Sequence, residues 1–313
     1  MMANINFDFM KYRRIAAGLS VAIVLASLLS LLLNQVNWGL DFTGGTLVEV
    51  VYESPIDPGT IRSELDSAGF NGHVVQYFGS ERDILVRIPP QKNMTAKENA
   101  TLGDEILNVL QSTPGAQVSL RRSEFVGPAV GEELTNQGGL GMLTALAVVL
   151  VYIAMRFQMK FAIGAVVALF HDVIIILGIF SVTRWDFDLT VLAALLAVIG
   201  YSLNDTIVVA DRIRENFRRV RKGTSLEIIN TSLNQTLGRT VVTSLTTLLV
   251  LVTLYLLGGE LIRGFALGLI IGVVVGTYSS IYIAANVMIL MKISKEDLAI
   301  PVKEGAEDPD MMG

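Results

Sequence analysis

The chain has 313 residues, of which 52% are hydrophobic, and a mean hydropathy of +0.55, which indicates a membrane protein. Its net charge of −5 without a long basic run argues against nucleic-acid binding. The chain has no cysteine and only two histidines, which excludes disulfides, thiolate-bound zinc, iron–sulfur clusters and thiol catalysis, and disfavours a histidine-rich metal site.

Six apolar segments are long enough to cross a bilayer, since roughly 20 helical residues span its hydrocarbon core. They lie near 15–33, 138–155, 161–182, 189–210, 240–257 and 261–291. The first segment has an apolar run longer than that of a signal peptide, and no A-x-A cleavage site follows it. It is therefore predicted to be an uncleaved anchor.

Basic residues alternate along the short connections, which predicts the orientation of the spans. The first 14 residues, the connection between spans two and three, and the arginine-rich segment 211–239 are basic, whereas 183–188 and 258–260 are not. Both termini and the predicted loop 211–239 are therefore expected in the cytoplasm. Residues 34–137 are expected on the other side. The acidic tail, 292–313, is expected to be disordered.

The outer segment 34–137 has the pattern of a small α+β domain. Alternating β-branched runs predict strands at 46–53, 73–78, 83–88 and 116–126, and amphipathic stretches predict helices at 57–69 and 95–111. The order β-α-β-β-α-β is that of the ferredoxin-like fold. Because this fold hosts many functions, a spacer or docking module is the favoured interpretation.

An acidic residue, Asp205, interrupts the fourth apolar segment. A charge near a bilayer centre costs at least about 2.5–3.5 kcal/mol, so such a residue normally faces a bundle interior or a water-filled path. Ala193, Ala197 and Tyr201 precede it at intervals of four residues, so all four residues share one helix face. We expect this face to lie against a neighbouring helix.

A basic residue, Arg239, opens the fifth segment, and Thr243 follows one turn later on the same face. If spans four and five pack antiparallel, Arg239 can reach towards Asp205. A buried acid without a partner favours its protonated form, and an adjacent guanidinium favours the carboxylate. Separation and approach of the pair would thus drive proton uptake and release. A static ion pair that locks two helices is an equally open alternative.

Two further polar residues, His171 and Asp172, lie at the midpoint of the third segment. Adjacent helical residues point about 100° apart, so we expect them not to face a single partner. Asp172 falls on a stripe of small residues and could donate a hydrogen bond or belong to a proton path. His171 could titrate near neutral pH. Hydrogen bonding between helices is the competing interpretation.

The sixth segment has glycines at 264, 268, 272 and 276, which predicts a smooth packing ridge. No Walker A motif and no hydrolase pattern is present, so direct ATP use is unsupported and we expect the chain not to be an enzyme. No cofactor or metal is expected. Energy would have to come from the membrane gradient.

Four motifs together resemble a known family. They are "GLDFTGGT" (39–46), "FVGPAVGEEL" (125–134), "HD" (171–172) and "GYSLNDTIVVADRIREN" (200–216). With six spans and one large outer loop, they are similar to the SecF family, the smaller membrane subunits of bacterial SecDF complexes, which are related in design to resistance-nodulation-division transporters. The fold class expected is therefore a polytopic α-helical membrane protein of six transmembrane helices, with a ferredoxin-like α+β periplasmic domain between the first two.

The resemblance implies a bacterial inner-membrane protein that pairs with SecD into a twelve-helix unit. That unit would associate with the SecYEG channel, often with YajC, and would use the proton gradient to help export unfolded polypeptides after the SecA ATPase has driven early steps. The family's proton-transport residues correspond to Asn204, Asp205, Arg239 and Thr243 here. The resemblance does not settle whether His171 and Asp172 are on the path. Asp41, Gly44 and Gly45 are expected to be structural, joining the first span to the outer domain.

Two other function classes remain open at this point. The chain could be a scaffold, in which Asp205 only holds helices together and the subunit stabilises its partner. It could also be half of a small-molecule exporter of the same superfamily. Against the exporter, the outer domain has only about 100 residues, well within the size of one small domain.

Overall fold

A computed structural model describes residues 7–91, 96–112, 117–220, 222–294 and 297. The chain divides into two compact units, which we describe separately. The first unit contains residues up to Val36, Ala145–Trp185 and those from Ala193 onwards, and the second contains Asn37–Thr144 and Asp186–Leu192. Most of the tail 292–313, predicted to be disordered, lies outside the described residues.

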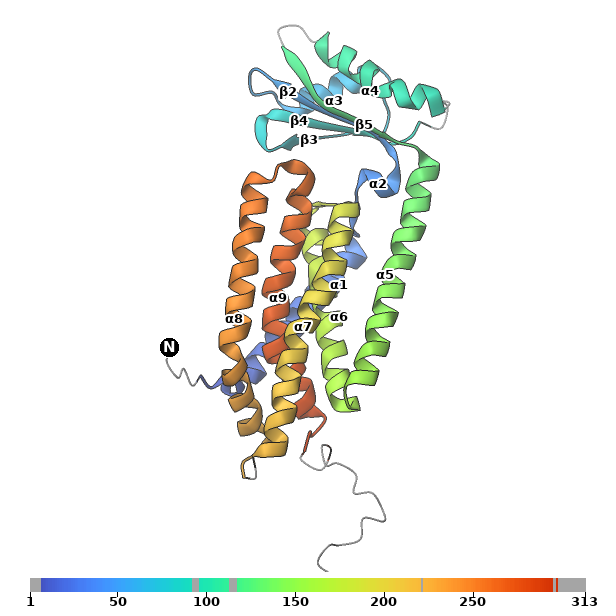
Figure 1. Cartoon of the computed structure of the whole chain (residues 1–313). Helices are drawn as coiled ribbons and strands as arrows, with labels where there is room; N and C mark the ends of the chain where they lie inside the picture. The colour runs from blue at the N-terminus through green and yellow to red at the C-terminus, as the bar shows by residue number, and fades with distance from the viewer. Residues whose placement is uncertain (1–6, 92–95, 113–116, 221, 295–296, 298–313) are drawn as a thin grey trace, which may run out of the picture. The chain divides into compact units, whose positions relative to one another are not determined.

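Six helices in the described part are long and apolar enough to cross a membrane, which confirms the predicted number of spans. They are α1 (Arg13–Leu33, preceded by the 3₁₀ helix η1, Phe9–Tyr12), α5 (Pro128–Arg156), α6 (Met159–Thr183), α7 (Leu189–Arg219), α8 (Ser225–Leu257) and α9 (Glu260–Leu290). Figure 1 labels each of them.

The prediction of an arginine-rich loop over 211–239 is wrong. Helix α7 continues to Arg219, and α8 begins at Ser225 with a capping box in which the Thr224 hydroxyl and the Glu227 carboxylate each accept a backbone N–H. Helical spacing of buried apolar residues, including Ile213 and Phe217, continues the core beyond the bilayer-length run. Arg212, Arg214, Arg218 and Arg219 therefore belong to the last turns of α7, and Arg239 lies inside α8.

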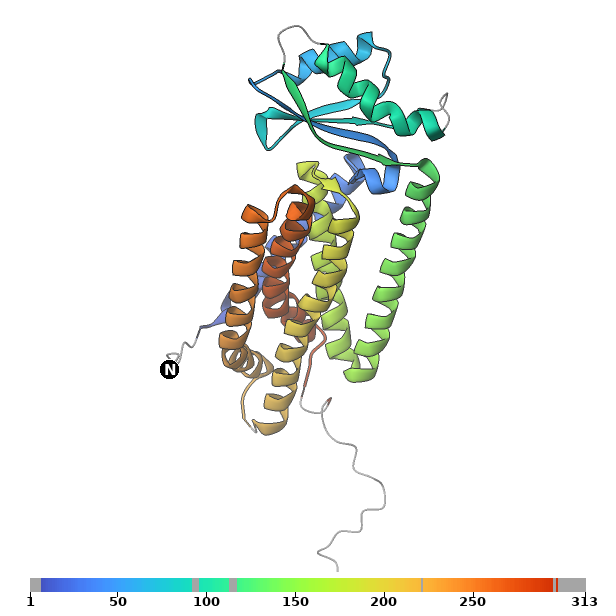
Figure 2. The same ribbon diagram turned by 45° about the horizontal axis from the view of Figure 1, so that its top comes forward.

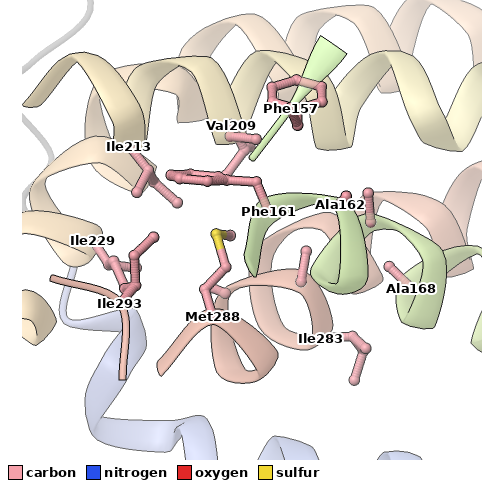
Figure 3. Close-up of a cluster of buried hydrophobic side chains, with 14 of the residues drawn as sticks. Phe157, Phe161, Ala162, Ala168, Val209, Ile213, Ile229, Ile283, Met288 and Ile293 are labelled. Atoms are coloured by element: carbon pink, nitrogen blue, oxygen red, sulfur yellow. The ribbon is translucent and has the colours of Figure 1, made fainter. Parts of the chain in front are cut away.

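A continuous apolar core fills the end of the first unit where α6 begins and α7 ends. Figure 3 shows Phe161 of α6 with Val209, Ile213 and Met288 around it. Val209 lies one helical turn beyond Asp205 on α7. Residues of this apolar cluster therefore lie on both sides of Asp205 along α7, at Leu203 and Val209.

Small residues let the helices of the first unit approach closely, as the glycine ridge predicted. A methyl group on Gly272 of α9 would overlap Val198 of α7, and one on Gly276 would lie 3.1 Å from the Ser202 side chain. Gly178 of α6 likewise faces Ser27 of α1 without room for a side chain. These contacts confirm the ridge as a packing surface at Gly272 and Gly276.

The second unit contains a four-stranded antiparallel sheet with two helices on one face, as Figure 2 shows. Its strands are β2 (Gly45–Tyr52), β3 (Val74–Phe78), β4 (Ser80–Ile88) and β5 (Val118–Val126), and its helices are α3 (Pro58–Ser67) and α4 (Ala96–Gln111). The spatial order β3-β4-β2-β5 confirms the ferredoxin-like fold. The predicted starts at 95 and 116 lie outside the described residues.

Alternation along β2 explains how the sheet is covered. Val48 and Val50 are fully buried with Ile61 of α3 and Ile106 of α4, and the two valines pair in register with strand β4. The intervening residue, Glu49, points to the opposite face, where its carboxylate lies 3.1 Å from the Arg121 guanidinium. The two helices therefore pack on one face of the sheet, and a single layer of apolar side chains lies between them and the strands.

A buried tyrosine at the end of β2 generates a prediction about alkaline stability. The Tyr52 hydroxyl has no hydrogen-bond partner among the described residues, and burial, aided by the nearby Glu64 charge, raises the pKa of Tyr52 above its ordinary value. A raised folded-state pKa means that the contribution of Tyr52 to stability is complete below the unfolded pKa of about 10 and is lost as pH rises through the folded-state value.

Tyr52→Phe is therefore expected to leave the free energy of unfolding at about pH 8 unchanged or raise it by up to about 1 kcal/mol, and to reduce the loss of stability near pH 11. Guanidinium unfolding followed through Trp38 fluorescence in a Trp185→Phe background measures both. Tyr77→Phe, at an exposed tyrosine, is the matched control. An equal alkaline loss with and without the Tyr52 hydroxyl would contradict the assignment.

Candidate functional site

The acid predicted in the fourth span, Asp205, lies inside the first unit. It is 3% exposed, and its Oδ2 atom is buried without a hydrogen-bond partner among the described residues. Helix α7 brings it there because Val198 and Ser202, on the same side of the helix, pack against glycines of α9. The carboxylate is thus withdrawn from the surface of this chain while one of its oxygens stays uncommitted.

Helices α7 and α8 pack antiparallel, as the pairing hypothesis required. The Tyr201 hydroxyl donates to Ser244 Oγ at 3.3 Å, and Arg212 Nε donates to Gln235 Oε1 at 2.7 Å. One turn from the Tyr201–Ser244 contact, towards the end of α7, this register brings Asp205 level with Thr240. The Thr240 hydroxyl is also buried without a hydrogen-bond partner in the described part of the chain.

The cation predicted to act on the acid, Arg239, lies next to Thr240 on α8. Because the α7–α8 contacts bring Thr240 level with Asp205, Arg239 lies near the same level of the bundle. However, no Arg239 nitrogen lies within 4.0 Å of an Asp205 oxygen, and the Arg239 side chain is exposed on this chain. The two groups are therefore near one another but not locked in an ion pair.

The other predicted proton-transport residues do not touch Asp205 in this conformation. The Thr243 hydroxyl donates to carbonyl oxygens of its own helix, at Arg239 and Thr240, both at 3.0 Å. Asn204 is exposed on the outer face of α7. The predicted packing face is only partly correct, because Ala193 and Ala197 are exposed whereas Asp205 is buried.

A second acid, Asp172 of α6, is 0% exposed, and both of its carboxyl oxygens have polar contacts. Its Oδ2 accepts hydrogen bonds from Ser202 of α7 at 2.5 Å and from Ser279 of α9 at 2.8 Å, and its Oδ1 lies 2.9 Å from His171 Nδ1. Because both serine hydroxyls donate, Asp172 Oδ2 is an acceptor. The sequence-based suggestion that it donates to a backbone group is not what the structure shows.

His171 and Asp172 also share a partner helix, contrary to expectation. The His171 ring stacks on Tyr278 of α9 with centroids 6.2 Å apart, while Asp172 contacts the adjacent Ser279. Both reach α9 because Tyr278 and Ser279 themselves diverge by about 100°, which matches the divergence on α6. No sequence pattern singled out Ser202 or Ser279 as donors, because serine also suits an inert small-residue stripe.

The "LDFTGG" stretch forms a junction between short elements in the second unit. It includes the short helix α2 (Leu40–Thr43), preceded by β1 (Asn37–Trp38), which pairs in parallel with β6 (Asp186–Phe187). Asp41 Oδ2 accepts the backbone N–H of Leu189 at 3.0 Å. A carboxylate at this position stabilises the amino-terminal end of α7.

The two glycines of the motif have backbone conformations that other residues rarely adopt. Gly44 has φ +66° and Gly45 has φ +120°, and a Cβ on Gly45 would overlap the Ile88 carbonyl oxygen. Arg87 ties the junction together, since its Nη2 donates to the Trp38 carbonyl at 2.7 Å and to the Thr43 hydroxyl at 2.6 Å. The chain can therefore enter β2 only with glycine at this place.

Charged groups beside the junction are partly desolvated. Burial raises the pKa of Asp186, whose neighbour Arg87 opposes the shift and whose neighbour Asp188 adds to it. Burial also lowers the pKa of Arg87, an effect that Asp186 opposes. The nearest atoms of the two side chains are 4.0 Å apart, so this is a loose ion pair. Within the described residues, no cluster of three or more acidic or histidine side chains could hold a metal ion.

Six apolar helices, an α+β domain inserted between the first two, and two acids buried among the spans define a polytopic membrane protein of transporter-like construction. The family model "Protein export membrane protein SecD/SecF, C-terminal" matches residues 106–294, and the model "SecD/SecF GG Motif" matches residues 29–56. The chain belongs to the SecF family of protein translocase subunits.

Similar proteins extend over the whole chain. The "Protein translocase subunit SecF" of Vibrio alginolyticus is 48% identical, with 99% of this chain and 98% of that protein covered, and the one from Escherichia coli O157:H7 is 45% identical over 98% and 95%. A crystal structure of SecDF, described as a translocon-associated membrane protein from Thermus thermophilus, matches with a TM-score of 0.83 and 36% identity. The match covers 93% of this chain and 39% of that SecDF chain.

The glycine geometry predicts a selective effect of one methyl group. Gly45→Ala is expected to lower the free energy of unfolding of the second unit by at least about 2 kcal/mol, because of the positive φ and the overlap with the Ile88 carbonyl. Unfolding monitored by Trp38 fluorescence measures this loss. Gly127→Ala, whose added Cβ would meet no atom within 4 Å, is the control. Equal stability of the two variants would show that the junction tolerates side chains.

Proposed function

We propose that this chain is the smaller subunit of a proton-driven membrane complex that promotes export of polypeptides through the Sec translocon, and that Asp205 is its proton-carrying group. The supporting observation is a carboxylate 3% exposed among membrane-length helices, with one oxygen free of hydrogen bonds in the described structure. Such a group can be neutral or charged without breaking a fixed bond. The proposal does not require the chain to catalyse a chemical reaction.

Energy for this work would come from the gradient. One proton crossing 100 mV releases about 2.3 kcal/mol, which is enough to shift a two-state equilibrium about 50-fold. Arg239 would modulate Asp205, because the α7–α8 contacts place it near the level of Asp205 without an ion pair between the two side chains. A small movement of α8 along α7 would then change which charge state of Asp205 is preferred.

The proposed partner is SecD, and the helix surfaces of this chain support a protein partner. Asn204 on α7 and Arg239 on α8 are exposed polar groups within membrane-length helices, and such groups are costly against lipid. The small residues Ala193, Ala197 and Gly200 on α7 are also exposed, which suits close approach of another helix. The complex would act beside SecYEG, with YajC as a further companion, on unfolded polypeptide in the membrane.

The proposed location is the bacterial inner membrane, with both termini in the cytoplasm and residues 34–137 in the periplasm. Basic residues support this orientation. Arg156 and Lys160 flank the α5–α6 turn, and Arg219 and Lys222 flank the α7–α8 turn, so both turns are expected to face the cytoplasm. The ferredoxin-like domain would then be placed where exported chains emerge.

Asp205→Asn is the decisive substitution, because it preserves size and hydrogen bonding and removes titration. In vesicles containing the chain, SecD and the translocon, the gradient-dependent increment in export rate is expected to fall at least about tenfold, because an amide cannot bind and release the proton. A positioned acid or base typically contributes about 100-fold or more. Asp211→Asn, at an exposed acid whose ion pairs are with Arg156 and Arg214, is the control and is expected to change little.

Assembly must be measured alongside export. If the complex with Asp205→Asn assembles normally and keeps its gradient-dependent increment, Asp205 is a structural residue and the scaffold alternative is favoured. Drug efflux from vesicles that contain the complex but no translocon would instead favour the exporter alternative.

Substitutions at Arg239 test whether charge or shape matters. Arg239→Lys keeps the cation and is expected to retain most of the gradient-dependent increment, whereas Arg239→Gln is expected to lose about tenfold or more, because a nearby opposite charge commonly changes an acid's proton affinity by that factor. Export rates with and without an uncoupler provide the measurement. Arg219→Gln, at an exposed arginine paired with Glu215, serves as the control. Equal loss for lysine and glutamine would refute a purely electrostatic role.

A further inference from the structure

A buried cluster of polar side chains lies in the first unit, where helices α1, α6, α7 and α9 meet. Its centre is the His171–Asp172 pair of α6, and its outer members come from the other three helices. Ser202 of α7 and Ser279 of α9 both donate to Asp172. The Tyr278 hydroxyl, in the next layer, donates to the Ala16 carbonyl of α1 at 2.8 Å.

The contacts indicate which nitrogen of His171 is available. Oδ2 of Asp172 accepts two serine hydroxyls, and Oδ1 lies 2.9 Å from His171 Nδ1. With Asp172 as a carboxylate, Oδ1 is an acceptor and His171 Nδ1 carries the ring proton. In the neutral ring, Nε2 therefore has the free lone pair. The His171 side chain is 6% exposed, and its Nε2 is buried without a hydrogen-bond partner in the described part of the chain.

This arrangement is unbalanced in charge. With a neutral imidazole, the buried pair has one net negative charge, which the interior of a membrane-spanning bundle disfavours. If Nε2 takes up a proton, the ring becomes an imidazolium, Asp172 remains ionised, and the pair becomes neutral overall. The proton binds to the nitrogen lone pair and leaves from the same atom, so nothing else changes covalently.

We propose that His171 and Asp172 form a second proton-binding site within the bundle, in which His171 Nε2 holds the proton and Asp172 stabilises the resulting cation. The inference rests on the proposed function only in its second part, that this site is coupled to Asp205. Ser202, whose hydroxyl binds Asp172, precedes Asp205 by three residues on α7, so both side chains lie on one side of that helix.

The surroundings limit which other groups influence the pair. On α7, Asp205 follows Ser202 by three residues. From α9 the Tyr278 ring stacks on the imidazole, and the Tyr282 ring is tilted against Tyr278 with centroids 5.3 Å apart. From α1 the described contacts are the Ser20 hydroxyl, which lies 2.9 Å from the Tyr278 hydroxyl, and a backbone carbonyl. Asp172 is therefore the only acid with a described contact to His171.

The primary test uses the unaltered protein, since the chain has only two histidines. With ¹⁵N-labelled histidine in the full chain, reconstituted with SecD in lipid, the ring-nitrogen signals report the protonation state of each imidazole. His73→Gln assigns the outer-domain signal. We expect the His171 signal to change from the neutral pattern to the doubly protonated pattern between about pH 9 and pH 5. A single charge state for His171 over that range would overturn the proposal.

Variants then separate proton binding from packing. Asp172→Asn keeps the shape and removes the charge that stabilises the imidazolium. The ratio of doubly protonated to neutral His171 at a given pH should therefore fall at least about tenfold. Ser202→Ala removes only the hydroxyl. In the Ser202→Ala protein, His171 should still change protonation state with pH. The effect of Asp205→Asn on the His171 signal should differ from its effect when Ser202 is present. An unchanged His171 titration in the Asp172→Asn protein would also overturn the proposal.

The export assay keeps the two proposals distinguishable. If Asp205→Asn abolishes the gradient-dependent increment while His171 does not titrate, the proposed function stands and this inference fails. If His171 titrates and Asp205→Asn has no effect on export, the site exists but its coupling to a proton-driven cycle is refuted. His171→Gln, which can still donate to Asp172, should shift the pH profile of export if both proposals are correct.

Discussion

The cost of placing carboxylates among membrane-length helices is the constraint on which the bundle depends. A single unsatisfied charge there costs several kcal/mol, so its surroundings must either neutralise it or bind each of its oxygens. Asp172 accepts hydrogen bonds from two neighbouring helices, through Ser202 of α7 and Ser279 of α9. Asp205 is buried almost as deeply but has an unbound oxygen in the described structure. The same physical cost therefore gives the two acids different roles.

Helix α7 carries both Asp205 and the Ser202 hydroxyl that binds Asp172. Its first residue, Leu189, donates its backbone N–H to Asp41, and Asp188 Oδ1 accepts the N–H of Val191 at 2.8 Å. Two carboxylates therefore cap the amino-terminal end of the helix. Further along, Ser202 binds the Asp172 carboxylate, and Asp205 follows within one turn. A displacement of α7 that frees Ser202 would also change the position of Asp205, because an α-helix transmits axial movement over such short distances.

The sequence predicts the elements of this protein better than their contacts. Hydropathy alone locates six spans, because bilayer thickness dictates their length. Alternation and helix boundaries predict the order of the ferredoxin-like domain. The two-residue pairing of β1 with β6 left no periodic signal. The charged end of α7 concealed the apolar spacing at Ile213 and Phe217 that extends this helix. Asp205 stood out because a charge interrupts an apolar run.

The partners of the buried acids could not be predicted, for a physical reason. Serine at 202 or 279 is compatible with both a donor and an inert small residue, and only the rotation of three helices relative to one another decides between them. The expected approach of Arg239 to Asp205 depended on antiparallel packing, which the α7–α8 contacts show, and also on a side-chain rotamer, which no pattern encodes. The resulting geometry is a nearby cation without an ion pair within 4.0 Å.

This uncommitted geometry bears directly on the scaffold alternative. An acid that only holds helices together is expected to resemble Asp172, with its oxygens bound and its donors supplied by neighbouring helices, because unpaired buried polar atoms weaken a fold. Asp205 has the burial of such a residue but not the hydrogen bonds, and the facing Thr240 hydroxyl is likewise unpaired among the described residues. A group that must exchange a proton gains from that freedom, since each permanent hydrogen bond to one charge state would oppose the other. The cost in stability at Asp205 is thus understandable if the side chain changes charge during its work, and it has no evident reason if the side chain is a fixed support.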